Sequence, residues 1–186
     1  MAAYFRTLGL AAMLLAGTTT ASAHSTLPRV EVCVADPEHV DGRVVLGATM
    51  QASRIYAEAG IAVIWVNSCS PDTVVLTLLT GEREKTMIRE LAAGTRVLGF
   101  ALASARRVYI FYDRISVTSG FTFERLLERV IAHEIGHVLL PGQGHCERGL
   151  MRAQAALAEP TTFTAAQQTF MRRFVTEGMR ATRTAH

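Results

Sequence analysis

The stretch from Ile131 to Met151, IAHEIGHVLLPGQGHCERGLM, holds the residues of this sequence best suited to chemistry. It begins with the pattern HExxH, from His133 to His137. Residues four apart on a helix lie on one face, so the two imidazoles can bind one zinc ion at about 2.0–2.1 Å. Glu134 can then face a water molecule that the zinc activates. The pattern therefore predicts a metal site with a general base beside it.

A catalytic zinc site needs a third protein ligand and one open position, and His145 is the candidate third ligand. It lies eight residues after His137, beyond a loop that carries Gly142 and Gly144. Glycine adopts positive φ readily, so this loop can return His145 to the metal. Glu159, 22 residues after His137, is an alternative third ligand if a later helix carries it.

The same stretch resembles the metzincin clan of zinc peptidases, in which the pattern HExxHxxGxxH is followed by a methionine turn. His133 and His137 match the two helical ligands of that pattern, and Glu134 matches its catalytic glutamate. Met151, in a G-L-M segment, resembles the turn methionine beneath the metal. The resemblance implies one Zn²⁺ per chain, with His145 in the position of the third ligand.

The sequence departs from the metzincin pattern between the second and third histidines. Gln143 stands where the pattern has its third histidine, and Leu140 stands where it has its glycine. The loop is therefore two residues longer, and its turn glycine is shifted to Gly142. A histidine at this longer spacing, followed by G-[I/L]-M, is similar to a divergent metzincin-like branch of small exported bacterial proteins.

The segment Gly99-Phe100-Ala101 is a candidate substrate-binding edge. It lies between two predicted strands, where the metzincin resemblance implies an edge strand that pairs with the extended substrate backbone. An edge glycine lets a peptide approach closely. An ordinary turn between strands is the alternative.

The apolar pattern predicts a single α+β domain, in which valine-rich runs form strands and apolar residues at helical spacing form helices. The resemblance implies a zincin-like mixed sheet of four or five strands, an active-site helix and a C-terminal helix. The segment 82–93 fits either a helix or a loop. The expected strands are 29–35, 61–66, 73–79, 98–101 and 107–113, and the expected helices are 40–59, 122–140 and 164–178.

Several residues are expected to mark the ends and faces of these elements. Gly60 should end the first helix and Gly81 the third strand. Thr122 is a candidate N-cap, and Pro141 a terminator, of the helix that carries HExxH. The buried face of the last helix is expected to use Phe163, Phe170, Met171 and Phe174.

Residues 1–23 have the features of a secretory signal peptide. Arg6 gives a positive n-region, residues 8–16 form an apolar core, and Ala21-Ser22-Ala23 is a small-residue cleavage site. Cleavage would leave residues 24–186 as one domain, exported to the periplasm or the extracellular medium. An uncleaved anchor is the alternative. No later stretch reaches the about 20 apolar residues of a membrane span, so none is expected after signal removal.

The cysteines indicate a disulfide, and the charge distribution limits the kinds of partner that the protein can bind. Cys33, Cys69 and Cys146 would lie in an oxidising compartment, where an odd count permits one disulfide and one free thiol. The pair Cys33–Cys69 is preferred, and Cys69–Cys146 is the alternative. The net charge of +3 comes from scattered arginines without a long basic run, which argues against nucleic-acid binding.

Motif and resemblance together imply a secreted zinc-dependent metalloendopeptidase. It would hydrolyse peptide bonds in peptide or protein substrates, with Glu134 as the general base. One alternative is an exported zinc-binding or interaction module without turnover. Another is a HExxH peptidase with Glu159 as third ligand. The third alternative is a structural domain that binds no metal.

Overall fold

The computed structural model describes residues 26–35, 40–118, 122–153 and 162–183. Two of the expectations above, the signal peptide at residues 1–23 and the alternative ligand Glu159, lie outside the described residues. Among the described residues, none of the helices combines the length and the hydropathy that crossing a bilayer requires.

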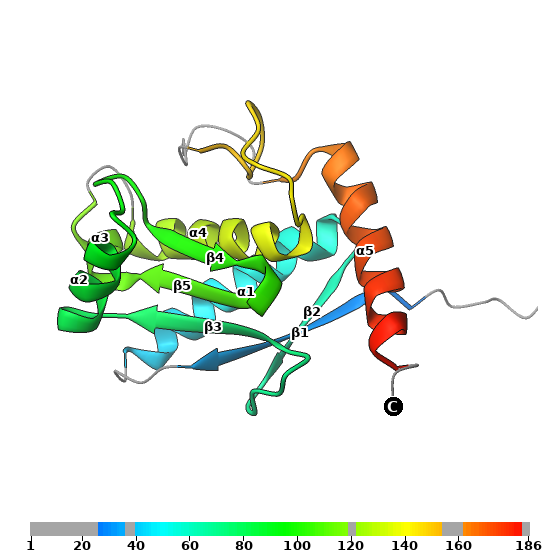
Figure 1. Cartoon of the computed structure of the whole chain (residues 1–186), viewed down its shortest axis with the longest axis horizontal. Coiled ribbons are helices and arrows are strands. Elements are labelled where there is room, and N and C mark those ends of the chain that lie inside the picture. The colour runs from blue at the N-terminus through cyan, green and yellow to red at the C-terminus, as the bar shows by residue number, and fades with distance from the viewer. Residues whose placement is uncertain (1–25, 36–39, 119–121, 154–161, 184–186) are drawn as a thin grey trace, which may run out of the picture.

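A five-stranded mixed sheet with the order β2-β1-β3-β5-β4 forms the centre of the fold (Figure 1). Strand β4 is antiparallel to β5, and the other neighbouring strands are parallel. Strands β2 and β4 are therefore the two edges. The expected α+β class and the mixed sheet are confirmed. The strands are β1 (Arg29–Ala35), β2 (Ala62–Val66), β3 (Val74–Leu79), β4 (Gly99–Leu102) and β5 (Arg107–Phe111).

Helices α1 (Gly42–Glu58) and α4 (Phe123–Leu139) cover one face of the sheet (Figure 1). Alternate strand residues such as Val32, Leu76 and Ile110 point into this layer and are fully buried. Asp41 is the N-cap of helix α1, and its side chain accepts a hydrogen bond from the Arg43 amide. The helix ends before Gly60, which has a φ of +77°. The apolar spacing of these segments thus produces the core that holds α4 in place.

Strand β3 ends at Leu79, just before Gly81, as expected, and Gly81 is also the first residue of helix α2 (Gly81–Glu90). The 82–93 segment is therefore largely helical. Helix α3 (Tyr112–Ser116) was not expected. The strand expected to reach Asp113 ends at Phe111 instead. Buried Glu84 of α2 accepts hydrogen bonds from the amides of Asp113 and Arg114, which stabilises the first turn of α3. This contact joins residues about 30 positions apart, so local sequence does not reveal it.

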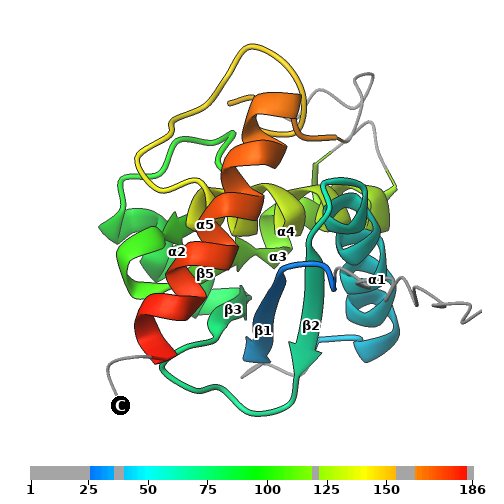
Figure 2. The same ribbon diagram turned by 90° about the vertical axis from the view of Figure 1, so that its right-hand side faces the viewer.

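Helix α5 (Ala165–Arg183) lies across one end of the sheet and contacts α4 and β1 (Figure 2). Arg172 donates a hydrogen bond to the carbonyl of Ala59, at the end of α1. Phe163 and Met171 are buried as expected, but Phe174 is 36% exposed, and Val175 takes the buried position instead. The helix continues past the expected end at Gly178 and extends to Arg183.

The ends of the helix that carries HExxH follow the expectation only in part. Thr122 occupies the N-cap position of α4, but its side chain makes no capping hydrogen bond. The helix ends at Leu139, two residues before Pro141. A proline cannot continue a helix without clashing with the preceding turn, so the sequence predicts that the helix ends here.

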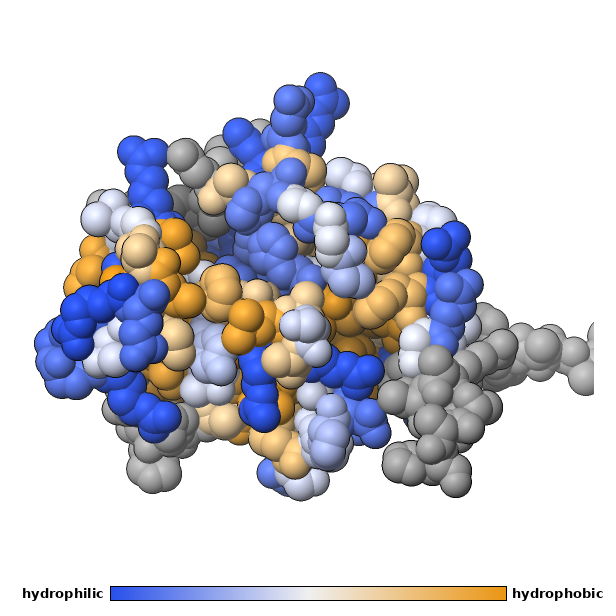
Figure 3. Space-filling model, in the orientation of Figure 1, coloured by the Kyte–Doolittle hydropathy of each residue, from blue (hydrophilic) through white to orange (hydrophobic). Residues whose placement is uncertain are grey.

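The other face of the sheet carries residues that alternate with the core, among them Val75, Thr77 and Tyr109. In Figure 3 this face shows hydrophobic and hydrophilic side chains intermixed. A hydrophilic area lies near the upper middle, between β4 and the loop that follows α4. The sheet is thus covered by helices mainly on the α1 and α4 side.

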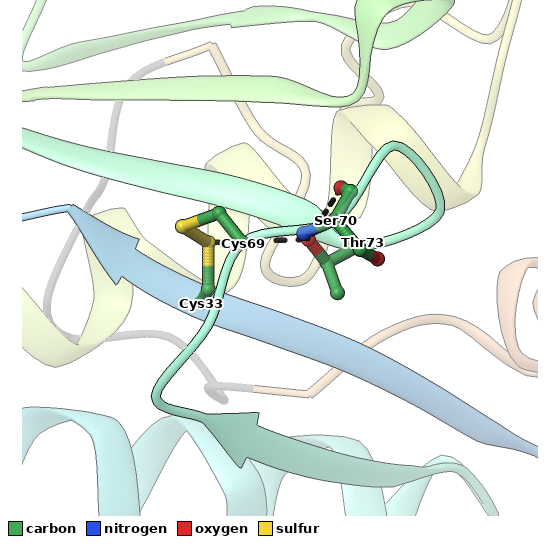
Figure 4. The surroundings of a disulfide bond; sticks show 4 residues. All are labelled: Cys33, Cys69, Ser70 and Thr73. Carbon is green, nitrogen blue, oxygen red and sulfur yellow. Dashed lines mark hydrogen bonds between the residues drawn. A yellow bond between two sulfur atoms is a disulfide. The ribbon is translucent and has the colours of Figure 1, made fainter.

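A disulfide joins Cys33 of β1 to Cys69, in the loop between β2 and β3 (Figure 4). The Thr73 hydroxyl donates to the carbonyl of Ser70 and accepts from its amide, which closes the same loop. The bond therefore ties the β2–β3 connection to β1, the strand that lies between β2 and β3 in the sheet. Cys146 is the free thiol.

Candidate metal centre

Helix α4 brings the first two histidines together. His133 and His137 lie four residues apart on one face of the helix, and their Nε2 atoms are 3.1 Å apart. The neighbouring residues Ile131, Ile135 and Val138 are buried in the core. The apolar residues of α4 therefore fix which face turns inward and leave the imidazoles on the face toward the following loop.

A tight turn after α4 reverses the chain, so that the third histidine, His145, lies near His133 and His137. The amide of Gln143 donates to the carbonyl of Leu140 at 3.0 Å, with Pro141 and Gly142 between them. Gly142 has a φ of +74°, the conformation that a type II turn requires at this position. Of the two glycines expected to permit the return, only Gly142 uses positive φ.

His145 then completes a cluster of three imidazoles. Its Nε2 atom lies 3.2 Å from the Nε2 atom of His133 and 3.2 Å from that of His137. Ligands about 2.0–2.1 Å from a tetrahedral zinc ion are about 3.3 Å apart, so these nitrogens have the spacing of a zinc site. The three histidines form a cluster that could hold a metal ion.

The ring of His133 is oriented by a backbone group. Its Nδ1 lies 2.8 Å from the carbonyl oxygen of Leu150. Because a carbonyl oxygen only accepts, Nδ1 must carry the hydrogen, which leaves a lone pair on Nε2 toward the other two rings. This is the outer hydrogen bond that orients a metal-binding histidine. The residue before Met151 thus takes part in the site through its backbone.

Burial keeps the helical histidines in the neutral form that binds metals. It lowers the pKa of His133, and it lowers the pKa of His137 to about 4, with a smaller contribution from the two neighbouring rings. An imidazole must be deprotonated at one nitrogen to bind a metal ion. Both rings therefore offer a lone pair at neutral pH.

Glu134 lies between α4 and the edge strand β4. It is 7% exposed, and burial raises the pKa of its carboxyl group to about 8. Gly99 of β4 makes room for it, because a Cβ on Gly99 would lie 2.7 Å from Cγ of Glu134 and 3.0 Å from its Cδ. The glutamate therefore fills the space on this face of the strand, whereas the expected pairing with a peptide concerns the free edge of β4 and stays a prediction.

Met151 lies under the same segment of α4. It is fully buried, and a Cβ on Gly136 would lie only 2.6 Å from its Sδ. Its carbonyl accepts a hydrogen bond from the amide of Cys146 at 2.9 Å. The chain from 146 to 151 is thus a closed loop whose last side chain packs beneath the HExxH pattern and whose first residue follows His145.

Gln167 supports this loop, and sequence reasoning missed it. Its side-chain oxygen accepts from the Thr164 amide, and the Thr164 hydroxyl accepts from the Gln167 amide, forming a capping box at the start of α5. Its Nε2 donates to Sγ of Cys146. The T-x-x-Q pattern could have revealed the cap, but nothing in the sequence joins it to Cys146. The Cys146 thiol donates to the Arg148 carbonyl and is not among the clustered metal-binding groups.

A cleft of about 580 Å³ contains the cluster. Its walls include β4 residues Gly99, Phe100 and Ala101, the three histidines, Glu134, and the loop around Leu150. Strand β4 pairs with β5 on one side, and no described strand pairs with its other side. The candidate edge segment is therefore an edge strand that borders the histidine cluster.

Comparison with known proteins defines the class of fold. The sequence matches no protein-family model and no curated protein. Among solved structures, archaemetzincin from Methanopyrus kandleri aligns with a TM-score of 0.54 and 15% identity, over 80% of this chain and 97% of that chain. The chain thus has the metzincin-like α+β fold of archaemetzincin.

Two further solved structures show weaker similarity. Archaemetzincin from Archaeoglobus fulgidus, complexed with malonate, aligns with a TM-score of 0.48 and 16% identity, over 76% of this chain and 99% of that chain. Myroilysin aligns with a TM-score of 0.41 and 15% identity, over 65% of this chain and 50% of that chain.

Proposed function

We propose that this chain is a zinc-dependent metalloendopeptidase. The observation that carries the proposal is the convergence of three imidazole Nε2 atoms, 3.1–3.2 Å apart, in a cleft bordered by an edge strand. The donor set fits zinc, because three neutral histidines leave one position of a tetrahedral ion for water or substrate. One zinc ion per chain would be held by His133, His137 and His145.

Glu134 is the proposed general base. A zinc ion held by three histidines makes water more acidic and polarises a carbonyl group. Glu134 would take the proton from the attacking water and return it to the nitrogen of the leaving amine. Its position supports this role, since Glu134 is 7% exposed and lines the same cleft as the three histidines.

The edge strand β4 is the proposed substrate guide. The free edge of β4 would pair with the extended backbone of a peptide and lay it across the cleft. Glu134 packs against Gly99 of this strand. A peptide aligned on β4 would therefore pass beside both the base and the histidine cluster.

Export of the protein is part of the proposal. The disulfide between Cys33 and Cys69 is the type of bond that forms in the periplasm or outside the cell rather than in the cytosol. Residues 1–23 would be removed on export, and the mature chain would begin at His24. Intact-mass measurement of the exported protein tests the cleavage position.

The first test replaces Glu134 with Gln. The zinc content should stay near one per chain, because Glu134 is not a ligand, while kcat for a peptide library should fall at least about 1,000-fold. The matched control is Glu124→Gln, since Glu124 is exposed in the first turn of the same helix. Undiminished hydrolysis by the Glu134 variant would reject the assignment of the base.

The second test separates the two candidate third ligands. We expect His145→Ala to weaken zinc binding by at least about 100-fold, because one of three protein ligands is lost. Glu159→Ala should bind zinc as tightly as the unchanged protein. Both affinities can be measured by competition with a chromophoric chelator. The reverse pattern would assign the third position to Glu159.

A further inference from the structure

Strand β4 carries different side chains on its two faces. Gly99 faces Glu134 of α4, and Ala101 packs against the hydrophobic core. Because side chains alternate along a strand, Phe100 and Leu102 point to the opposite face of the sheet, which we call the outer face. Strand β4 therefore has its two small residues on the α4 side and its two large apolar residues on the outer face.

The register between β4 and β5 gives the same assignment. Phe100 pairs with Tyr109. Leu102 pairs with Arg107. Neither of these two partners belongs to the hydrophobic core, whereas Val108, which lies between them on β5, is fully buried in it. The outer positions of the two strands are therefore adjacent to each other, on the face that α1 and α4 do not cover.

The two large residues of β4 stand beside a free edge of the sheet. Leu102 is 42% exposed, and Phe100 is partly buried. No described strand pairs with this side of β4. A strand added there would place alternate side chains directly opposite these two residues, with Cβ atoms about 4.5–5.5 Å apart. The outer face of β4 thus offers apolar contacts to a strand that pairs with its edge.

The position of this edge indicates which strand occupies it. Gly99, Phe100 and Ala101 line the cleft that contains the three histidines, and Leu102 continues the same strand just outside it. A peptide paired with β4 therefore passes the proposed zinc site and the outer face at the same time. Its successive side chains point alternately into the cleft and over the outer face. A substrate thus contacts two different surfaces of the protein.

We propose that the outer face of β4 selects substrates that carry two large apolar side chains separated by one residue. The inference rests on the proposed function and names its substrate class. One of these side chains lies against Phe100 and the other against Leu102, because residues i and i+2 of an extended peptide share a face. Aromatic and β-branched side chains are preferred, since they form the most favourable cross-strand pairs with such residues.

Binding tests the inference without turnover. Zinc-loaded Glu134→Gln protein is titrated, with fluorescence anisotropy as the readout, against labelled Ser/Gly peptides of equal length. The spaced peptide has two valines separated by one residue, and the adjacent peptide has two neighbouring valines. The spaced peptide should bind about two- to fivefold more tightly, because only it can place both valines on the outer face. Equal binding of the two peptides, which have the same composition, would overturn the inference.

Single variants locate the effect on the outer face. In the same protein, Leu102→Thr should bring the ratio of spaced-peptide to adjacent-peptide affinity close to one, since threonine keeps the strand propensity but removes apolar surface. Phe100→Thr should act likewise, and Leu102→Thr decides the question if the Phe100 variant folds poorly. The matched control is Leu46→Thr, the same change at an exposed leucine of α1. An unchanged ratio in Leu102→Thr, or an equal effect of the control, would overturn the inference.

A second copy of this chain is the competing occupant of the β4 edge. Sedimentation of the zinc-loaded protein, at the concentrations of the binding assay, should show a monomer. A dimer that dissociates in the Leu102→Thr variant would overturn the inference, because the outer face of β4 would then be an interface between subunits.

Failure of the inference and failure of the proposed function give different results. If the unchanged protein hydrolyses a peptide library without preference for spaced apolar residues, the function stands and the inference fails. If it cleaves nothing but binds the spaced peptide more tightly in a way that depends on Leu102, the inference stands as a binding specificity and the proposed function fails.

Discussion

At the scale of single residues, Gly99 and Glu134 depend on each other. Glu134 lies one position after a metal-binding histidine, but the strand that faces it determines where its carboxylate stands. A Cβ at position 99 would lie only 2.7 Å from Cγ of Glu134 and 3.0 Å from its Cδ, so the glutamate would have to shift. A residue that sequence analysis associates with substrate binding thus also determines the position of the proposed general base.

Replacement of Gly99 by Ala tests this dependence. The added methyl group should displace the Glu134 carboxylate, and kcat should fall on the order of 100-fold, since small misplacements of catalytic groups have effects of that size. Zinc content should not change, because the ligands are untouched. Peptidase kinetics and metal analysis on the same sample measure both.

The matched control is Gly94→Ala. Gly94 lies in the loop before β4, and nothing stands within 4 Å of where its Cβ would be. This variant should retain full activity. If the Gly99→Ala variant also retained full activity, Glu134 could not occupy the position next to Gly99 when the protein is active.

At the scale of elements, the start of α5 supports the loop that carries the third histidine. Gln167 belongs both to the capping box of α5 and to the contact with Cys146. The Leu150 amide also donates to the Thr162 carbonyl, just before α5. The start of the C-terminal helix therefore supports the 146–151 loop beside the candidate metal site, and none of its described residues belongs to the histidine cluster.

Gln167→Leu should have two separate effects. Loss of the capping box should lower the free energy of unfolding by about 1 kcal/mol. Loss of the contact to Cys146 should weaken zinc binding about tenfold, as is usual for groups that position a ligand indirectly. Chemical denaturation of the metal-free protein and chelator competition measure the two effects.

Thr164→Ala is the control that separates them. It removes the capping hydroxyl but leaves the Gln167 side chain able to reach Cys146. We expect it to lower stability by a similar amount and to leave zinc affinity unchanged. Equal losses of zinc affinity in both variants would mean that zinc binding depends on the stability of α5 and not on the contact between Gln167 and Cys146.

At the scale of the whole molecule, the disulfide stabilises the sheet and not the metal site. Cys33 alternates with Val32, which is buried on the α1 and α4 side, so the bond lies on the opposite face of the sheet. It links residues 36 positions apart. We therefore expect its removal to lower the stability of the domain and to leave the geometry of the cleft unchanged.

The double variant Cys33→Ala/Cys69→Ala should lose about 3–4 kcal/mol of unfolding free energy, the amount expected for closing a loop of this length. Its zinc content and kcat per folded molecule should match the unchanged protein. A reductant should destabilise the unchanged protein to the same level and have no effect on the variant. A loss of zinc in the folded variant would contradict the separation of the two faces.

Elements with strong local signals could be predicted from the sequence. The valine-rich segment 29–35 and the apolar spacing of 40–59 and 122–140 predicted a strand and two helices close to their observed limits. The short helix α3 could not be predicted. Its first turn is stabilised by Glu84, a residue on another helix, and the apolar run before it continues the pattern of a strand.

The sequence by itself determined which groups can bind a metal ion. The spacing of His133 and His137 is a local property of one helix, and the proline and glycine after it define a local turn. The tertiary structure alone decided that His145 completes the cluster, that the Leu150 carbonyl orients a ring, and that Gly99 admits Glu134. These contacts join residues 8 to 35 positions apart, and their geometry depends on packing of the whole domain rather than on local backbone preference.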